Sequence, residues 1–377
     1  MTTRDDTTDH SRRRFLGFAA WAAAGMTALG GTRSFAQSAA PAKMPEITAI
    51  PDKLKGSGEV RIAGYGGTGQ DAERSAYFAP FEKLSGIKTL DFPGADVNKV
   101  KAMVDTGNVE WDVVQLGRST VKNLQKKGDY FEKIDYDLVD VDNIDPLYRY
   151  DYALDMLVWS QVMAYRTDAF KGAVPNGWAD FWNVTKFPGD RALTGAGPST
   201  PELEFALMAA GVPPDKLYPI DIEKAFGSYD KIKASVVKWW ETGAVPVQML
   251  TDREVVLTSV WNGRMAAIQA AGVPAAISWN QGLLKRDCWA VPKNSPNKAN
   301  AMKFIAFSTL AVSQARLSML IPYGSVNNKS AEYLSEKQLE ALPSAPAIKS
   351  QLVPYNYEWW ADNRDTVIGR WNKWILA

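Results

Sequence analysis

An alternation of strand and helix patterns between residues 59 and 128 most constrains the fold of this chain. Short apolar stretches typical of buried strands each precede a helical pattern that ends at a glycine. Parallel strands need a crossover connection, usually a helix, so this order predicts an α/β fold with a mostly parallel sheet and flanking helices. The strands are expected at 59–65, 87–92 and 111–117, and the helices at 70–86, 96–107 and 119–128.

The rest of the chain continues the mixture of strands and helices without internal repeats. About 340 residues beyond the N-terminal segment exceed the usual size of one hydrophobic core, so two lobes are expected. We expect a long strand ending near Tyr165, a helix at 201–211, a helical stretch at 221–243, a strand running into a helix at 255–272, a strand at 287–294, and helices at 299–310 and 312–321.

The first residues of the chain are typical of a targeting segment. Paired arginines followed by Phe-Leu, within 11–16, indicate a twin-arginine export signal. The apolar stretch 15–31 is short and rich in Ala and Gly, and small residues precede a cleavage site after about Ala36. We therefore expect 1–36 to be a signal peptide handled by the Tat export machinery, 37–56 to be a tether, and the protein to be periplasmic. An uncleaved N-terminal anchor is the alternative.

The composition excludes several classes of function. The chain has 43 Lys and Arg against 42 Asp and Glu, so the balance argues against nucleic acid and against a polybasic membrane surface. Its only histidine, His10, lies in the predicted signal peptide, and Cys288 is its only cysteine. We therefore expect no Ser-His-Asp triad, no metal site, no cofactor and no intrachain disulfide. A hydrolase that works through paired carboxylates stays open.

A glycine-rich loop follows the first expected strand. Gly64, Gly66 and Gly69 have the spacing of a dinucleotide-binding turn, and Asp91 follows at about the distance of a ribose-binding acid. Pro80 in the next helix counts against that function, because proline costs about 3 kcal/mol in a regular helix. An exported NAD(P)-binding oxidoreductase and a plain strand–helix turn without ligand both stay open.

Several stretches, taken in their order behind the export signal, resemble the periplasmic solute-binding proteins of ABC importers, of the polyamine (spermidine/putrescine) type. They are "FAPFEKLSGIK", "WDVVQLG", "NGWADFWNVTKFPGDRALTG", "SVWNGRMAAIQAAGVPAAI", "DCWAVPKNSPNKANAMKFIAFST" and "IPYGSVNNKS". The resemblance implies a two-lobed, type II periplasmic-binding-protein fold that closes around its ligand by a hinge. It also implies a monomer that delivers a small-molecule solute to an inner-membrane ABC permease, without catalytic residues. The implied lobes are 57–157 with 288–322, and 158–287 with 323–377.

The resemblance also implies which residues contact the solute. Aromatic walls pack on the methylene chain of an amine, and a carboxylate pairs with its ammonium group. Each aromatic residue could equally be ordinary core, and the acid could be a surface salt bridge. The implied ligand-binding residues are Tyr65, Gly66, Gly67, Thr68, Arg118, Ser119, Glu202, Trp261, Asp287, Tyr323, Trp359 and Trp360.

The chain departs from the polyamine-binding pattern where a second acid is expected. Pro198 and Pro201 stand near those positions, and only Glu202 or Glu204 is close. A polyamine has an ammonium group at each end, and one left buried without a partner costs several kcal/mol. One end of a polyamine is thus provided for by Asp287, and the other is not.

A second departure follows the third expected strand. Gly117 and Arg118 stand where the family offers a hydroxyl group. An arginine beside the cleft would repel a polyamine and attract a carboxylate. Two ligands are therefore expected as alternatives: a polyamine such as putrescine or spermidine, or a zwitterion or other carboxylate-bearing amine. Arg118 could also be a solvated start to the next helix.

Overall fold

The computed structural model describes residues 43–196 and 200–377. The predicted signal peptide, its cleavage at Ala36, the first part of the tether and Pro198 lie outside the described residues. Residues 43–377 form one compact unit. Within the described ranges, every helix is too short or too polar to cross a membrane.

The described strands form one ten-stranded sheet in the order β2-β1-β3-β9-β5-β8-β6-β7, with β4 beside β5 and β10 beside β9. Their bounds are β1 Glu59–Gly64, β2 Lys88–Pro93, β3 Val113–Gly117, β4 Arg149–Tyr150, β5 Ala153–Arg166, β6 Arg191–Thr194, β7 Val236–Trp240, β8 Leu257–Trp261, β9 Ala275–Ala290 and β10 Val353–Pro354.

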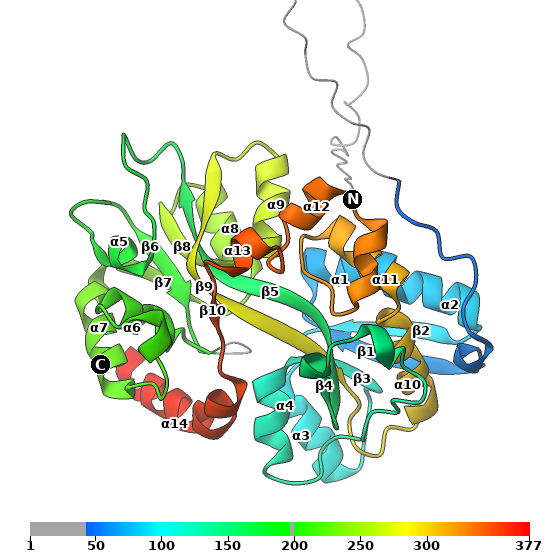
Figure 1. Ribbon diagram of the computed structural model, residues 1–377. Coiled ribbons are helices and arrows are strands. Elements are labelled where there is room, and N and C mark those ends of the chain that lie inside the picture. Colours follow the sequence, from blue (N-terminus) through cyan, green and yellow to red (C-terminus); the bar gives the residue numbers. More distant parts are fainter. Residues whose placement is uncertain (1–42, 197–199) are drawn as a thin grey trace, which may run out of the picture. The chain divides into compact units, whose positions relative to one another are not determined.

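Two long strands, β5 and β9, run antiparallel through the middle of the sheet (Figure 1). The strands β1, β2 and β3 are parallel to one another on one side, and β6, β7 and β8 are parallel on the other. We call these the β1–β3 half and the β6–β8 half. The predicted mixed, mostly parallel α/β sheet with flanking helices is confirmed, and β5 and β9 make it continuous.

Helices cover both faces of each half. Their bounds are α1 Gly67–Glu73, α2 Ala79–Ser85, α3 Val97–Thr106, α4 Arg118–Gln125, α5 Trp178–Trp182, α6 Leu203–Ala209, α7 Ile222–Ile232, α8 Ala244–Thr251, α9 Asn262–Ala270, α10 Lys298–Ser308, α11 Ala311–Leu320, α12 Glu336–Glu340, α13 Pro346–Lys349 and α14 Tyr357–Ile375. Side-chain alternation explains the two faces, because Ile62 and Val113 face one core while their neighbours Ala63 and Val114 face another.

Local signals explain where several helices begin and end. The Asp96 carboxylate accepts hydrogen bonds from the Asn98 and Lys99 N–H groups at the start of α3, and Gly107 ends that helix in the left-handed conformation. The helix predicted over 70–86 exists with an interruption. A π-helical turn over Arg74–Phe78 separates α1 from α2, so that Pro80 falls in the first turn of α2, where proline is tolerated.

Two predictions of secondary structure were wrong. The stretch Val236–Trp240, expected to be helical, is the edge strand β7. Valine and tryptophan favour strands, and pairing with β6 decides the outcome. The strand expected from Asp287 is the end of β9, which begins at Ala275.

Candidate ligand-binding site

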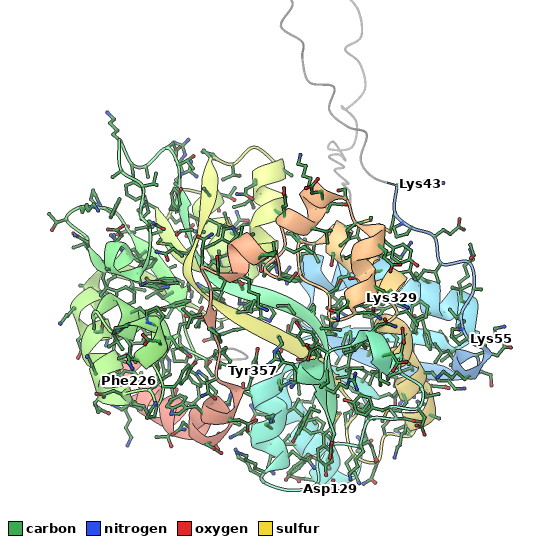
Figure 2. The ribbon with its side chains drawn as sticks, viewed as in Figure 1. Lys43, Lys55, Asp129, Phe226, Lys329 and Tyr357 are labelled. Atoms are coloured by element: carbon green, nitrogen blue, oxygen red, sulfur yellow. The ribbon has the colours of Figure 1, made fainter. Side chains whose placement is uncertain are left out.

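A cavity of about 90 Å³ lies over the middle of the sheet, with room for several water molecules at roughly 10–15 Å³ each. It collects residues from the carboxyl ends of β1, β3 and β8, from the middle of β5 and β9, and from the segment around Tyr357, which Figure 2 labels. The lining residues are Tyr65, Gly66, Gly69, Gln70, Glu73, Gln115, Gly117, Ser119, Thr120, Trp159, Thr200, Trp261, Arg264, Lys285, Arg286, Asp287, Tyr323, Tyr355 and Tyr357.

Asp287 is one acid of the cavity. It lies on β9 and is 8% exposed. The indole N–H of Trp159 donates to its Oδ1 at 3.0 Å, and the Gln115 amide donates to its Oδ2 at 3.4 Å. Burial raises the pKa of the Asp287 carboxyl to about 6, although these donors favour the charged form. Asp287 is therefore mostly ionised at neutral pH.

Glu73 is the second acid, at the end of α1. It is 3% exposed, and its Oε2 has no hydrogen-bond partner within the described part of the chain. Burial and, to a smaller extent, the charge of Asp287 raise the pKa of the Glu73 carboxyl to about 8, while the charge of Arg264 and a hydrogen bond with Gln115 act in the opposite direction. The empty cavity therefore holds one ionised and one largely protonated carboxyl group at pH 7.

Lys285 brings an ammonium group to the cavity. It lies two residues before Asp287 on β9, so both side chains project from the same face of the strand. Its Nζ lies 4.7 Å from the ring centre of Tyr355 and 5.4 Å from that of Trp159. Lys285 is 8% exposed, and among residues 43–196 and 200–377 its ammonium group has neither a hydrogen bond nor an ion pair.

The N-terminus of α4 meets the cavity as well. The helix follows Gly117, which offers no capping side chain, and Ser119 and Thr120 in its first turn line the cavity. Such a turn presents unsatisfied N–H groups and the positive end of the helix dipole. Together with Lys285, it makes this end of the cavity suited to an anion.

Arg264 explains the glycine-rich loop. Its Nη1 donates to Thr68 Oγ1 at 2.7 Å, and its Nη2 to the Gly66 carbonyl at 3.3 Å. An added Cβ atom at Gly67 would stand 3.1 Å from this guanidinium group, and Gly66 and Gly67 have φ values of 77° and 61°, which favour glycine. The loop thus holds a side chain of the protein itself.

The groups that a dinucleotide would use have other partners in this structure. The Gly66 N–H donates to Gln70 Oε1 at 2.8 Å. Asp91, the expected ribose-binding acid, accepts hydrogen bonds from Gln70 and Arg74. Nor do any three His, Cys, Asp or Glu side chains in the described ranges lie close enough together to hold a metal ion.

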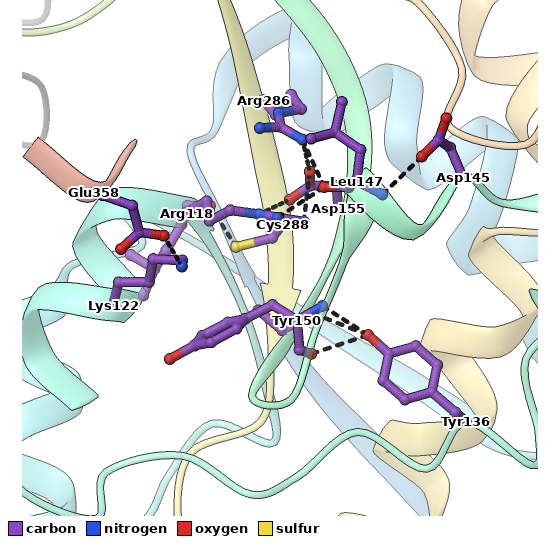
Figure 3. A network of polar contacts seen from close by, with 12 residues as sticks. Arg118, Lys122, Tyr136, Asp145, Leu147, Tyr150, Asp155, Arg286, Cys288 and Glu358 are labelled. Carbon is purple, nitrogen blue, oxygen red and sulfur yellow. Dashed lines mark hydrogen bonds and ion pairs between the residues drawn. The ribbon is translucent and has the colours of Figure 1, made fainter. Parts of the chain in front are cut away.

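Arg118 does not line the cavity and is paired with Asp155. Figure 3 shows Arg118 and Arg286 converging on this carboxylate, at 2.8 and 3.3 Å, and both guanidinium groups donate to the Leu147 carbonyl. Asp155 is fully buried. Arg118 was expected to attract a carboxylate of the solute, but in the structure it forms an internal ion pair instead.

The structure brings half of the predicted site residues to the cavity. Gly67 and Thr68 contact Arg264 instead, and the remaining residues lie behind the lining. Trp360 donates its indole N–H to Glu204 at 2.6 Å and stacks on Tyr355, and Trp359 packs on Tyr218. Both carboxylate oxygens of Glu202 are buried. The predicted residues that line the cavity are Tyr65, Gly66, Ser119, Trp261, Asp287 and Tyr323.

Several lining residues were missed from the sequence, and some had a usable signal. Lys285 lies two residues before Asp287 on the same face of β9, so a strand predicted over the full length of β9 would have identified it. Gln70 and Glu73 are three residues apart, which puts them on one face of α1. Trp159, on β5, has no comparable signal because nearly every residue of that strand is buried.

The chain is similar in sequence to known solute-binding proteins. Residues 76–347 match the sequence model of a family described as bacterial extracellular solute-binding protein. The chain is 38% identical over 326 residues to a γ-aminobutyric acid-binding protein of Pseudomonas aeruginosa, covering 84% of this chain and 91% of that one. A spermidine/putrescine-binding periplasmic protein of Escherichia coli is 25% identical over 296 residues, covering 75% and 82%.

Solved structures of proteins with similar sequences also superimpose on this chain over most of its length. The structure of a GABA receptor is 36% identical and superimposes with a TM-score of 0.77, covering 84% of this chain and 97% of that one. The binding protein AgtB of Agrobacterium tumefaciens, solved in complex with agropinic acid, is 34% identical with a TM-score of 0.79, covering 85% and 99%.

Proposed function

The chain belongs to the family of bacterial extracellular solute-binding proteins, and we propose that it is the substrate-binding component of an ABC importer. In this proposal the protein is exported through its twin-arginine signal, captures a small solute in the cavity, and delivers it to a permease of the inner membrane. The residues before Lys43 carry the export signal, and the described residues carry the binding site.

We propose further that the solute bears both an amino group and a carboxylate. The charge of the cavity carries this proposal. Arg264 and Lys285 face it with two acids, Asp287 and the largely protonated Glu73, while the third cation, Arg286, is already paired with Asp155. A polyamine would add further positive charge to this set, and buried charges without partners cost several kcal/mol. The polyamine expected from the sequence is therefore set aside in favour of the carboxylate-bearing amine.

The two ends of the solute have different surroundings in this proposal. Lys285 and the N-terminus of α4 would bind the carboxylate. Asp287 and the aromatic rings of Trp159 and Trp261 would bind the ammonium group. Since Lys285 and Asp287 are two residues apart on a strand, their Cα atoms are roughly 7 Å apart. That separation suits an amino acid whose two charged groups are several bonds apart, such as γ-aminobutyrate, the compound in the name of the 38% identical relative.

Calorimetry on the purified chain, unfolded and refolded to remove carried ligand, tests the proposal. The titrants are γ-aminobutyrate, an α-amino acid, butyrate, putrescine, spermidine and NAD. We expect micromolar or tighter binding of γ-aminobutyrate and at least 100-fold weaker binding of putrescine. Heat from a polyamine but not from any amino acid would contradict the proposed solute, and heat from NAD alone would contradict the transport function.

The variant Lys285→Met tests the carboxylate end. Loss of a charge-assisted hydrogen bond is expected to weaken γ-aminobutyrate binding by roughly 10- to 100-fold. Lys293→Met is the matched control, because Lys293 is partly exposed, pairs with Asp129 and does not line the cavity. Equal affinities of the two variants would exclude Lys285 from carboxylate recognition.

A further inference from the structure

We propose that Glu73 recognises the amino group of the solute and releases its proton to solvent when that group binds. This inference rests on the proposed function, since it requires an amine-bearing solute in the same cavity. It assigns a role to a buried acid that the ion pairs of the fold do not use, and it makes solute capture depend on pH.

The position of Glu73 supports the assignment. Gln70 and Glu73 lie three residues apart on α1, and both line the cavity. The Gln70 side chain is occupied by Gly66 and Asp91. Oε2 of Glu73 is buried and without a hydrogen-bond partner in the described ranges, and a buried acceptor without a partner destabilises the folded protein. A donor from the solute would remove that destabilisation.

The other acid of the cavity cannot satisfy an ammonium group by itself. An ammonium group has three N–H donors. Both oxygens of Asp287 already accept a hydrogen bond, one from Trp159 and one from Gln115. A carboxylate has about four acceptor sites, so Asp287 has about two left for the three donors, and Oε2 of Glu73 is a further acceptor in the same cavity.

The surroundings of Glu73 keep its proton in place while the cavity is empty. Two acids, one cation and three phenol groups interact electrostatically with Glu73, so that their ionisation and that of Glu73 affect each other. Burial and Asp287 raise the pKa of Glu73 to about 8, and Arg264, whose guanidinium group is held by Thr68 and Gly66, lowers it only in part. The titratable neighbours are Asp287, Asp91, Arg264, Tyr65, Tyr77 and Tyr323.

The step balances without any other reactant. In the empty cavity the Glu73 carboxyl group carries the proton on one oxygen. When the ammonium group arrives, the O–H bond of Glu73 breaks, the proton passes to water or buffer, and the carboxylate accepts an N–H hydrogen bond from the ammonium group. The solute keeps all its protons, so each binding event releases up to one proton.

The test measures this proton directly. γ-Aminobutyrate is titrated by calorimetry at pH 7 in phosphate and in Tris, whose ionisation enthalpies differ. We expect the difference in heat to correspond to release of close to one proton per solute, because a group with a pKa near 8 is mostly protonated at pH 7. Glu73→Gln should abolish the release. The matched control is Glu202→Gln, a second buried acid whose pKa is raised to about 7 but which does not line the cavity, and it should retain the release.

The pH profile gives a readout that needs no variant. Because the protonated form must lose its proton, the dissociation constant of the unaltered protein should fall about tenfold for each unit by which the pH rises toward 8. Above pH 8 it should level off. In Glu73→Gln this slope should vanish above about pH 7, where Asp287 is already ionised. The two proteins should therefore differ most above pH 8 and converge near pH 6.

The outcomes separate this inference from the proposed function. If no amine-bearing solute binds the unaltered protein, the proposed function fails. If γ-aminobutyrate binds without proton release, if Glu73→Gln keeps the slope, or if Glu202→Gln removes the release, the inference fails while the proposed function stands.

Discussion

At the scale of single residues, buried charges divide into those with internal partners and those without. Asp155 holds Arg118 and Arg286, and this cluster needs nothing from a solute. Lys285 and Glu73 are nearly as buried, yet neither forms an ion pair among residues 43–196 and 200–377, and Oε2 of Glu73 has no hydrogen-bond partner there. The ammonium group of Lys285 lies over the rings of Tyr355 and Trp159. A buried charge is expensive without a partner. Lys285 and Glu73 line the cavity, whereas Arg118 and Asp155, which pair with each other, do not.

The Asp155 cluster leads to a prediction about stability. Asp155→Ala would leave two arginines buried without a counter-charge, which is expected to lower the free energy of unfolding by about 3–5 kcal/mol. Urea denaturation followed by tryptophan fluorescence measures this loss. Asp151→Ala is the control, because Asp151 is exposed on the same part of the chain and should change stability by less than about 0.5 kcal/mol. Equal midpoints for the two variants would mean that the ion pairs are not required.

The residue scale also limits what the sequence can predict about the site. The expected aromatic wall at Trp359 or Trp360 was close, but Tyr355 and Tyr357 line the cavity instead. All four residues lie at the junction of β10 and α14, where one residue further along a helix turns a side chain by about 100°. Composition identifies such a segment, and only its exact backbone path decides which ring faces the solute.

At the scale of elements, α4 and α14 are joined by a ladder of ion pairs. Lys122 pairs with Glu358, Lys126 with Asp362, and Lys127 with Asp365. Lys122, Lys126, Glu358 and Asp362 repeat at four-residue spacing, which puts each set on one helix face. The helix α4 packs in a core of the β1–β3 half, and α14 in a core of the β6–β8 half. The ladder therefore connects the two halves beside the cavity.

This ladder predicts that closure is sensitive to salt and charge. Exposed pairs contribute about 0.2–1 kcal/mol each, so the three pairs together account for about 0.6–3 kcal/mol. Reversing the charges of Lys122, Lys126 and Lys127 to glutamate should therefore weaken solute binding by roughly 3- to 100-fold. Reversing Glu358, Asp362 and Asp365 to lysine in the same protein should restore the affinity. Binding constants at low and high salt measure the effect. An unchanged constant in the first variant, or no recovery in the second, would contradict a role in closure.

Elements were easier to predict than their pairing. The strands and helices between 59 and 128 follow from apolar patterns and glycine stops, because those signals are local. The edge strand β7 was taken for helix because Val236–Trp240 gains its hydrogen bonds from β6, a contact that local pattern does not encode. The same holds for the first part of β9, whose partner is β5.

At the scale of the whole described unit, the segments predicted to cross between lobes lie side by side. Val158 on β5 pairs with Arg286 on β9 and also forms a bridge with Gly324. Irregularities in the β5–β9 register occur between Asp155 and Leu157 and between Gln161 and Met163, on both sides of Val158. Bulges bend strands locally. These features support the predicted lobe boundaries at 157/158, 287/288 and 322/323, which remain a proposal.

Hinge closure around the solute predicts a change in both stability and size. Solute at 100 times its dissociation constant should raise the free energy of unfolding by about 2.7 kcal/mol through mass action alone. Small-angle scattering should give a smaller radius of gyration with solute than without it, and thermal unfolding should shift upward. A thermal shift without any change in radius would indicate binding to an already closed protein.

The sequence by itself determined the α/β class, the family resemblance, the export signal as an expectation, and, through that resemblance, a part of the lining that includes Tyr65, Trp261 and Asp287. These properties depend on local patterns, which are written along the chain. Only the tertiary structure decided which charges face each other. It paired Arg118 with Asp155 and placed the buried Lys285 and Glu73, neither of them in an ion pair among the described residues, at the same cavity. The physical reason is that the ionisation and the role of a buried charge depend on neighbours in space, and those neighbours come from segments far apart in the sequence.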